Sequence, residues 1–368
     1  MKNGNHRDGT GIDRKLHNPI EDRLIPLESL DLSSVRTVND LVQAMGKTAF
    51  TGRQVGEAAD VLEAMARDTE CFVVMTLSGA MTVAKQSLII ADLIDRGIVN
   101  AIVSTGALMA HGLVEATGRA HFRYNPDVSD TELYEQGYNR VYDTLEPEQN
   151  LDDVEEVISH VLESWDHSEV LCSYKLNHAI GEYLAKHAKG QRGILKSAYE
   201  NGVPVFVPAF TDSELGLDVA LNNRLRESTG RHKLRFDPFE DLEHFAATLL
   251  RQTKLGIFTI GGGVPRNWAQ QFGPFCELRH RRLGENVPLK RYHYGVRICP
   301  EPVHWGGLSG SPYSEAISWG KFVPPAEGGK FGELFVDATV GLPLVVAAVL
   351  ERLGKAKTTG KKKAVAKK

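Results

Sequence analysis

Short apolar runs alternate with helix-like segments along most of the chain. The run CFVVMTLSG (71–79) is typical of a buried strand that ends in a turn of small residues. The segment after it, AMTVAKQSLIIADLIDRG, repeats apolar residues at helical spacing and stops at Gly97. The segment IVNAIVSTGA (98–107) predicts a second strand. Further strands are predicted in 204–210, 255–263, 294–300 and 332–341, followed by a final helix in LPLVVAAVLERLG.

Strand–turn–helix units in series predict the fold class. They are typical of an α/β protein whose mostly parallel sheet is covered by helices on both faces. No internal repeat or linker divides the chain, so we predict a single large domain over residues 35–353. Residues 1–34 are expected to form a partly flexible N-terminal extension, and residues 354–368 a disordered basic tail.

Composition and charge narrow the class of protein. The chain is 42% hydrophobic and 24% charged, which is typical of a soluble globular protein. Its formal net charge is −4, but the tail carries seven lysines and no acid, so the rest of the chain is more acidic than this total. An acidic body argues against a nucleic-acid-binding core and leaves only a weak contact through the tail. No run approaches a membrane span, and the polar N-terminus contains no signal-peptide segment.

Cysteine and histidine positions indicate neither a disulfide framework nor a metal site. The four cysteines lie far apart without a CxxC pair, which fits a reducing cytoplasm. Four histidines invite a metal interpretation, but their spacing fits no helical or hairpin ligand pair, so we predict no metal site. These residues are Cys71, Cys172, Cys276 and Cys299, and His111, His121, His293 and His304.

Five turns of small residues follow predicted strands, with the sequences TLSGAM, STGAL, FTDSELG, IGGGVPRN and FVDATV. Ligands of parallel sheets bind at the carboxyl ends of strands, where backbone amides and helix N-termini point outward. Small residues also simply permit tight turns. Five such turns, two of them with an embedded Asp212 or Asp337, favour a dinucleotide or similar ligand. None matches GxGxxG, so the spacing does not identify the cofactor.

The segment SEAISWGKF (314–322) places Glu315, Trp319 and Lys321 close together. A lysine amine becomes a nucleophile when burial lowers its pKa. Trp319 could supply an apolar wall or stack on a cation, and Glu315 could bind a substrate ammonium. The pattern alone leaves open a core tryptophan beside a surface lysine.

Several motifs in series resemble the deoxyhypusine synthase family over residues 35–350. They are SEAISWGK, TLSGAM, STGA, the segment ATGRAHFRYNPDVSDTELYEQGYNRVYD, PVFVPAFTDSELG, GGGVP and FVDAT. The resemblance implies a Rossmann-like fold and a homotetramer that binds NAD between subunits. It also implies a polyamine substrate such as spermidine, whose aminobutyl group passes through an imine on a lysine to an acceptor amine.

The same resemblance implies roles for individual residues. Lys321 corresponds to the imine-forming nucleophile, Trp319 lines the polyamine tunnel, and Glu315 binds an amine. The residues expected around NAD are Thr105, Gly106, Asp212, Gly262, Ser309, Asp337 and Ala338.

Departures from the family pattern concentrate in the substrate site. Members that modify a translation factor carry KHH after the glycine triplet, with a histidine proposed as acid or base, where this chain reads RNW (266–268). Leu217 replaces a polyamine-binding aspartate, while Trp305 and Leu308 stand where FDGSDSG carries acids. An acid expected after STGA is also missing, and His111 falls near that position. This combination most resembles the bacterial deoxyhypusine synthase-like branch.

We therefore predict a cytoplasmic, NAD-dependent aminobutyl transferase with a small amine acceptor, similar to a homospermidine synthase. Asn267, Trp268 and His304 are predicted to join Glu315 and Trp319 in binding the substrate. One alternative is a deoxyhypusine synthase that modifies a lysine of a translation factor, with new anchors such as His304, Glu301 or Glu214 in place of the lost acids. Others are a hydrolase of guanidino amines such as agmatine, and a non-catalytic NAD- or polyamine-binding protein.

Overall fold

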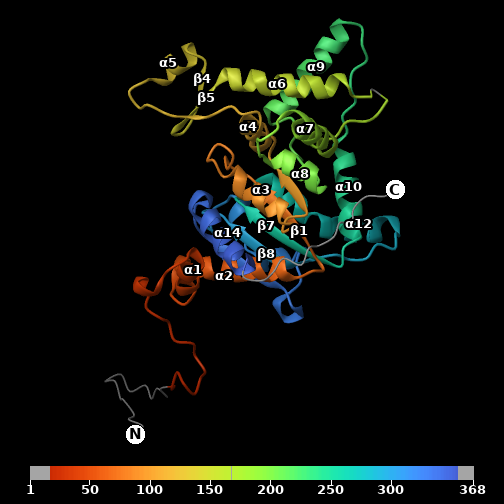
Figure 1. Ribbon diagram of the computed structural model, residues 1–368. Coiled ribbons are helices and arrows are strands. Elements are labelled where there is room, and N and C mark those ends of the chain that lie inside the picture. Colours follow the sequence, from red (N-terminus) through yellow and green to blue (C-terminus); the bar gives the residue numbers. More distant parts are fainter. Residues whose placement is uncertain (1–16, 167, 355–368) are drawn as a thin grey trace.

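A six-stranded sheet runs through the centre of the molecule in the computed structural model, which describes residues 17–166 and 168–354 (Figure 1). The strand order is β6-β2-β1-β7-β8-β9, and every neighbouring pair is parallel. The strands are β1 Cys71–Leu77, β2 Ala101–Ser104, β6 Val205–Phe206, β7 Lys254–Ile260, β8 Tyr292–Ile298 and β9 Lys330–Leu334. Each overlaps a segment expected from the apolar pattern, so the predicted parallel sheet is confirmed.

Helices cover both faces of this sheet, as the alternation of buried strand residues requires. Val73 and Met75 of β1 belong to a core shared with α2, α3 and α14, whereas Val74 belongs to a second core shared with α10, α11 and α12. The helices are α1 Val38–Gly46, α2 Phe50–Arg67, α3 Ser87–Asp95, α4 Gly106–Ala116, α5 Asp130–Glu135, α6 Glu148–Glu163, α7 Ser173–His187, α8 Ile194–Asn201, α9 Glu214–Ser228, α10 Pro238–Leu250, α11 Gly263–Gln270, α12 Phe272–Leu283, α13 Tyr313–Ile317 and α14 Ala338–Gly354.

A small antiparallel sheet, which the apolar pattern did not predict, stands at the end of the molecule away from the N-terminal segment (Figure 1). Its strands are β3 Phe122–Arg123, β4 Tyr138–Val141 and β5 Thr144–Pro147, in the order β3-β5-β4. They are two to four residues long, and β3 and most of β4 are exposed. Strands this short and exposed show no regular apolar alternation.

The end of the predicted last strand needs correction. The segment 332–341 was expected to be extended throughout, but β9 ends at Leu334 and α14 begins at Ala338. The carboxylate of Asp337 accepts a hydrogen bond from the backbone N–H of Thr339 at 2.8 Å. An aspartate that accepts from the first turn of a helix stabilises its start, so Thr339 and Val340 are helical despite their β-branched side chains.

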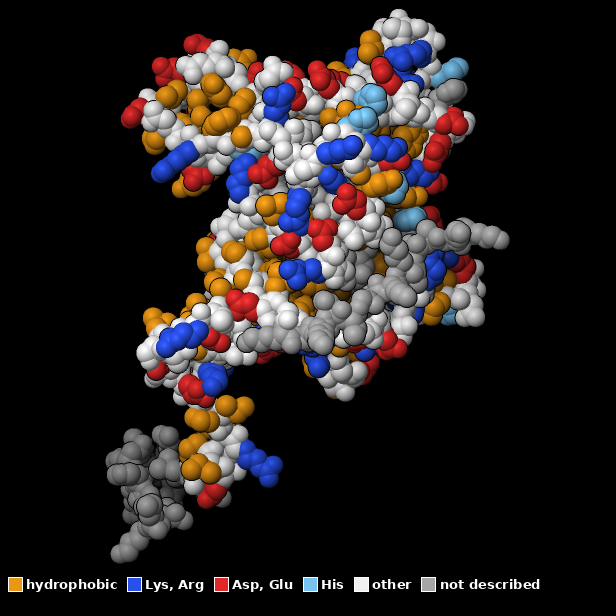
Figure 2. Space-filling model, in the orientation of Figure 1, with side chains coloured by type: hydrophobic (Ala, Val, Ile, Leu, Met, Phe, Trp, Pro, Cys, Tyr) orange, Lys and Arg blue, Asp and Glu red, His pale blue; other side chains and the backbone are white. Residues whose placement is uncertain are grey.

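The first residues that the structure describes lie apart from the sheet and its helices (Figure 2). Residues 17–34 are all exposed and run away from the body of the molecule (Figure 1). The expectations for residues 1–16 and 355–368 lie outside the described residues. No helix in the described part of the chain is long and apolar enough to cross a membrane.

Candidate active site

Lys321 lies in the turn that follows α13, and its backbone is fixed to the sheet. Its carbonyl accepts a hydrogen bond from the N–H of Tyr292 at 3.0 Å, beside the start of β8. Gly320 precedes it at φ +68°, a conformation that costs glycine little and other residues more. This turn leaves the side chain of Lys321 half-buried.

The amine of Lys321 contacts an amide rather than an acid. Its Nζ donates to Oδ1 of Asn267 on α11 at 3.1 Å, and it lies 6.0 Å from the ring centroid of Trp319. Burial lowers the pKa of Lys321, the positive charge of Arg266 lowers it further, and Glu315 opposes both effects. The balance favours the neutral amine more than in an exposed lysine, and the neutral amine is the nucleophilic form.

Two buried arginines fix the loop that leads into this segment. Arg266 and Arg297 both donate to the carbonyl oxygen of Ser309, at 3.0 and 2.7 Å. Both also donate to the carbonyl of Ser311, at 2.7 and 3.0 Å. Arg266 is 4% exposed, and burial lowers its pKa. One residue of the divergent RNW sequence therefore supports the site structurally and adds positive charge near Lys321.

The turns predicted to bind a cofactor lie at the carboxyl ends of three neighbouring strands. Thr105, after β2, donates its N–H to Leu77 at the end of β1 at 3.2 Å. Ser78, after β1, accepts from the N–H of Gly262 after β7 at 2.8 Å. After β1 the next strand, β2, lies toward one edge of the sheet, and after β7 the next strand, β8, lies toward the other edge. The topological switch point is therefore between β1 and β7. Ligands of open parallel sheets bind in the crevice at such a point.

Close backbone approach within these turns explains two of the glycines. A Cβ on Gly262 would lie 2.4 Å from Cβ of Ser309, whose hydroxyl accepts from the N–H of Gly263 at 3.1 Å. A Cβ on Gly106 would lie 2.1 Å from Oγ of Ser213, the residue after Asp212. One pair of predicted cofactor residues, Gly262 and Ser309, is therefore in direct contact, and Gly106 lies against the neighbour of Asp212.

The remaining predicted site residues differ from one another in exposure and in contacts. Asp212 is exposed, and the carboxylate of Asp337 is occupied by the start of α14, where Ala338 is buried. Glu315 and His304 are exposed, and Trp319 is 64% exposed. The ring of Trp268 packs against those of Phe206 and Phe245, with centroids 5.8 and 4.8 Å away. This packing favours a core role for Trp268.

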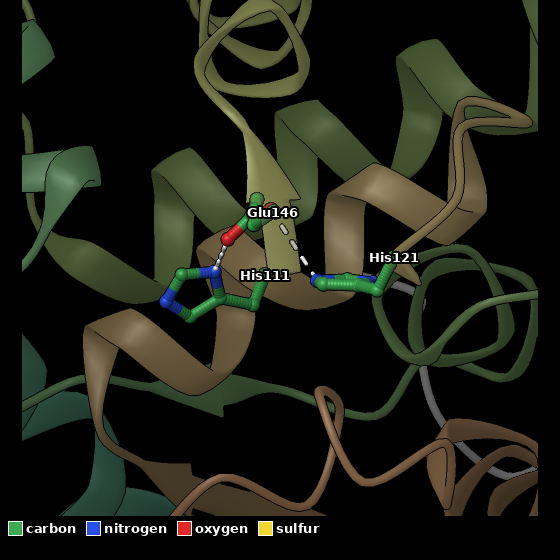
Figure 3. A group of neighbouring side chains, drawn as sticks. All are labelled: His111, His121 and Glu146. Carbon is green, nitrogen blue, oxygen red and sulfur yellow. Dashed lines mark ion pairs between the residues drawn. The ribbon is translucent and has the colours of Figure 1, made fainter. Parts of the chain in front are cut away.

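The sequence interpretation missed a group formed by two of the four histidines and one acid. His111, His121 and Glu146 offer ligand-type atoms that all lie within 4.8 Å of one another (Figure 3). They come from α4, from the residue before β3 and from β5, so spacing along the chain gave no signal. The prediction of no metal site rested on that spacing and stays a prediction.

The fold and the site define a class of protein, namely an α/β protein with small-residue turns at a topological switch point and a lysine amine of lowered pKa. The family model described as deoxyhypusine synthase matches residues 40–349. The chain is 32% identical over 328 residues to probable deoxyhypusine synthase 2 of Methanosarcina acetivorans, covering 89% of this chain and 90% of that protein. It is 32% identical to a deoxyhypusine synthase-like protein of Chlorobaculum tepidum, covering 87% of this chain and 88% of that protein.

A solved structure agrees with these matches in fold. A putative deoxyhypusine synthase from Entamoeba histolytica aligns with a TM-score of 0.56 at 16% identity, covering 88% of this chain and 96% of that one. The chain belongs to the deoxyhypusine synthase family. It is therefore an enzyme of the aminobutyl transferase class, whose cofactor is NAD.

Proposed function

We propose that this enzyme transfers an aminobutyl group from spermidine or a similar polyamine to an acceptor amine through an imine on Lys321. The observation that carries this proposal is the environment of the amine, half-buried against Asn267 with a buried Arg266 nearby. Burial and the charge of Arg266 lower the pKa of Lys321, and the hydrogen-bond partner of its amine is an amide and not an acid. Glu315 and Trp319 would bind the substrate beside it.

The crevice residues fit NAD, which supplies reversible hydride transfer when bound. Gly262 has no Cβ and lies directly against Ser309, so the turn after β7 and the loop at Ser309 are held together at this end of the sheet. Gly106 is the first residue of α4, and the N-terminus of a helix favours a phosphate. Asp212 and Thr105 lie at the same end of the sheet and would contact the cofactor.

For the acceptor, the comparisons favour a lysine of a protein over the small amine predicted from the sequence. The archaeal relatives are named as probable deoxyhypusine synthases, and they match this chain over nearly its full length. We therefore rank modification of a translation-factor lysine first. Exposure of Trp319 and Glu315 at the surface of one chain is compatible with entry of a protein loop.

A small amine acceptor remains the second candidate, because the lost acids have apolar replacements. Leu217, Trp305 and Leu308 are 58, 62 and 79% exposed where carboxylates were expected. Fewer carboxylates bind a polycation less tightly, since each ammonium that leaves water needs a partner. Hydrolysis of guanidino amines with water as acceptor has no specific support among these contacts and stays a prediction.

Assembly of subunits is part of the same proposal. Leu217, Leu221 and Leu225 repeat every fourth residue on α9 and are 58, 60 and 55% exposed. An apolar stripe of this kind on a helix is expected to be covered by another surface. We propose a homotetramer in which neighbouring subunits complete the active site. A cytoplasmic location fits the four cysteines, which lie in the described part of the chain and form no disulfide.

Measuring amines consumed and produced, with and without NAD, tests the reaction and its acceptor. The purified chain is incubated with spermidine and either a translation-factor substrate or putrescine, and the products are analysed by mass spectrometry. Release of 1,3-diaminopropane that requires NAD supports aminobutyl transfer. A modified protein lysine supports the first acceptor, and homospermidine supports the second. Release of urea from agmatine, with no diaminopropane from spermidine, would contradict the proposal.

A further inference from the structure

A row of ionisable side chains runs from His121 through Glu146 to His111 on α4 (Figure 3). His111 Nδ1 lies 2.5 Å from one carboxylate oxygen of Glu146, and His121 Nε2 lies 3.3 Å from the other. Glu146 is 1% exposed, and the side chain of His121 is fully buried. The side chain of His111 keeps 19% exposure, so it is the member of the chain that can reach a ligand.

Lys85 determines which nitrogen of His121 carries the proton. Its Nζ lies 2.7 Å from Nδ1 of His121, and a lysine ammonium can only donate hydrogen bonds. Nδ1 of neutral His121 is therefore the acceptor, and its proton lies on Nε2, facing Glu146. Glu115 lies 2.9 Å from Lys85 and is the outermost member of this row of side chains, which we call the relay.

The same contacts argue against a metal ion in this group. Two histidines and a carboxylate are the ligands of many zinc sites, where each ligand lies about 2.0–2.2 Å from the metal through an unprotonated atom. Here Nε2 of His121, which faces Glu146, carries a proton, and Nδ1 of His121 faces the ammonium of Lys85. The 2.5 Å separation of His111 Nδ1 from Glu146 is that of an ion pair between the imidazole ring and the carboxylate.

The orientation of His111 leaves its second nitrogen available. Nδ1 faces the carboxylate of Glu146, which favours a proton on that nitrogen, so Nε2 is the acceptor of the neutral ring and points away from Glu146 (Figure 3). No hydrogen bond to this Nε2 is found among residues 17–166 and 168–354. A histidine oriented by a buried carboxylate, with the opposite nitrogen open, is the usual arrangement of a general base.

The charges that act on His111 come from two elements, β5 and α9. Burial lowers the pKa of His111, but the hydrogen bond and charge of Glu146 from β5 and the charge of Glu214 from α9 outweigh it and raise the pKa. Burial raises the pKa of Glu146, but hydrogen bonds and charges from His111 and His121 lower it to about 2. Glu146 thus stays ionised at neutral pH, and it stabilises the imidazolium that forms when His111 accepts a proton.

His111 also shares a helix with one of the predicted cofactor residues. It is on α4, whose first residue is Gly106, and Glu214 follows Asp212 by two residues. Where members that modify a translation factor carry KHH, this chain has Arg266, Asn267 and Trp268, none of which accepts a proton at neutral pH. A proton acceptor is therefore missing from α11 and present on α4.

We propose that His111 is the acid–base residue of this enzyme, that Glu146 positions it, and that His121 and Lys85 fix Glu146 from behind. This proposal rests on the proposed function. A protonated secondary amine has no lone pair with which to form a carbon–nitrogen double bond. His111 Nε2 takes the proton from that nitrogen, so the N–H bond breaks, its electron pair stays on nitrogen, and imidazolium forms. The same proton returns to the leaving amine in the following step.

The relay itself is tested without turnover, by nuclear magnetic resonance of the full-length protein with ¹⁵N-labelled histidine. We expect the Nδ1–H tautomer for His111, the Nε2–H tautomer for His121, and a His111 pKa that falls in Glu146→Gln. Metal analysis of the purified protein and of protein incubated with zinc is expected to give no stoichiometric binding to this group. An Nε2–H tautomer at His111, an unchanged pKa in Glu146→Gln, or one zinc bound through His111 would each overturn the relay.

The catalytic part is tested by the rate at which Lys321 is trapped as an adduct during a single turnover with spermidine. We expect His111→Gln to slow this rate about 100-fold at pH 7, within the usual range for a general base. This loss of rate should become smaller as the pH approaches the pKa of the free amine. Added imidazole should partly restore the rate of His111→Ala. His160→Gln, which changes an exposed histidine on α6, should stay within twofold of the wild type.

The outcomes separate this proposal from the proposed function. A wild-type enzyme that forms no Lys321 adduct contradicts the proposed function, and the spectroscopic experiment still decides whether the relay exists. A wild-type adduct that forms equally fast in His111→Gln, with the same pH profile, contradicts only the role of His111. A folded Glu146→Gln variant whose pH profile shifts to lower pH supports its positioning role. An unshifted profile in that variant contradicts it.

Discussion

Nζ of Lys321 donates a hydrogen bond to Oδ1 of Asn267 at 3.1 Å, and this contact explains how a divergent site keeps a usable lysine. An amide oxygen accepts a hydrogen bond without bringing a negative charge. A carboxylate there would stabilise the ammonium form, whereas the amide leaves burial and the charge of Arg266 to lower the pKa of Lys321.

Replacing Asn267 with aspartate should therefore slow the chemistry of Lys321. The new carboxylate, about 3 Å from the amine, should raise the pKa of Lys321 by one unit or more and lower the neutral fraction about tenfold. The rate of adduct trapping measured from pH 6 to pH 10 should shift to higher pH by the same amount. Asn267→Leu is the matched control, because it removes the acceptor without adding charge. A profile that does not move in Asn267→Asp would show that this contact does not set the pKa.

Gly262→Ala should impair the cofactor crevice because there is no space for a methyl group. Its Cβ would lie 2.4 Å from that of Ser309, so the turn after β7 and the loop at Ser309 must separate. We expect at least tenfold weaker NAD binding by calorimetry and a clear fall in melting temperature. Gly306→Ala is the control, since a Cβ there meets nothing within 4 Å and its φ is not positive. Equal effects of the two substitutions would contradict the close approach.

Asp218→Asn should stabilise the protein at alkaline pH. Burial, together with the charges of Glu155 and Glu214, raises the pKa of Asp218 to about 7 from an ordinary value of 3.8. A protonated Asp218 in the native state therefore contributes to the free energy of unfolding. This contribution is complete below pH 3.8 and is lost as the pH rises through 7. Asparagine does not ionise, so the variant should gain on the order of 1–3 kcal/mol at pH 8 and almost nothing near pH 4.

Urea unfolding of the two proteins at both pH values measures this difference. Asp152→Asn, at an exposed acid of α6, is the control and should change stability little at either pH. If Asp218→Asn gains as much near pH 4 as at pH 8, the raised pKa is not the cause.

Most of the fold could be predicted from the sequence because buried parallel strands are continuous apolar runs. The pattern located β1 and β7 to within a few residues. It failed where local hydrogen bonding decides the structure, as at Asp337, which starts a helix where β-branched residues indicated a strand. It also failed for β3, which consists of two exposed residues.

The site was predictable only in part. Lys321 was identified by resemblance to a family, because the spacing in SWGK does not separate a buried amine from a surface one. Its contact with Asn267 joins positions 54 residues apart, which no local pattern indicates. Glu146 lies in the polar sequence LEPEQN and gave no sign that it would be 1% exposed between two histidines. Trp268 was expected to bind substrate, and only its contacts with Phe206 and Phe245 indicate a core role.

Mass spectrometry of the peptide that contains Lys321, after incubation with NAD and spermidine and reduction with borohydride, tests the central claim most directly. We expect one aminobutyl group on Lys321. This modification should require NAD and should be absent from the Lys321→Arg variant. An unmodified Lys321 in a folded enzyme that still releases 1,3-diaminopropane from spermidine would contradict it.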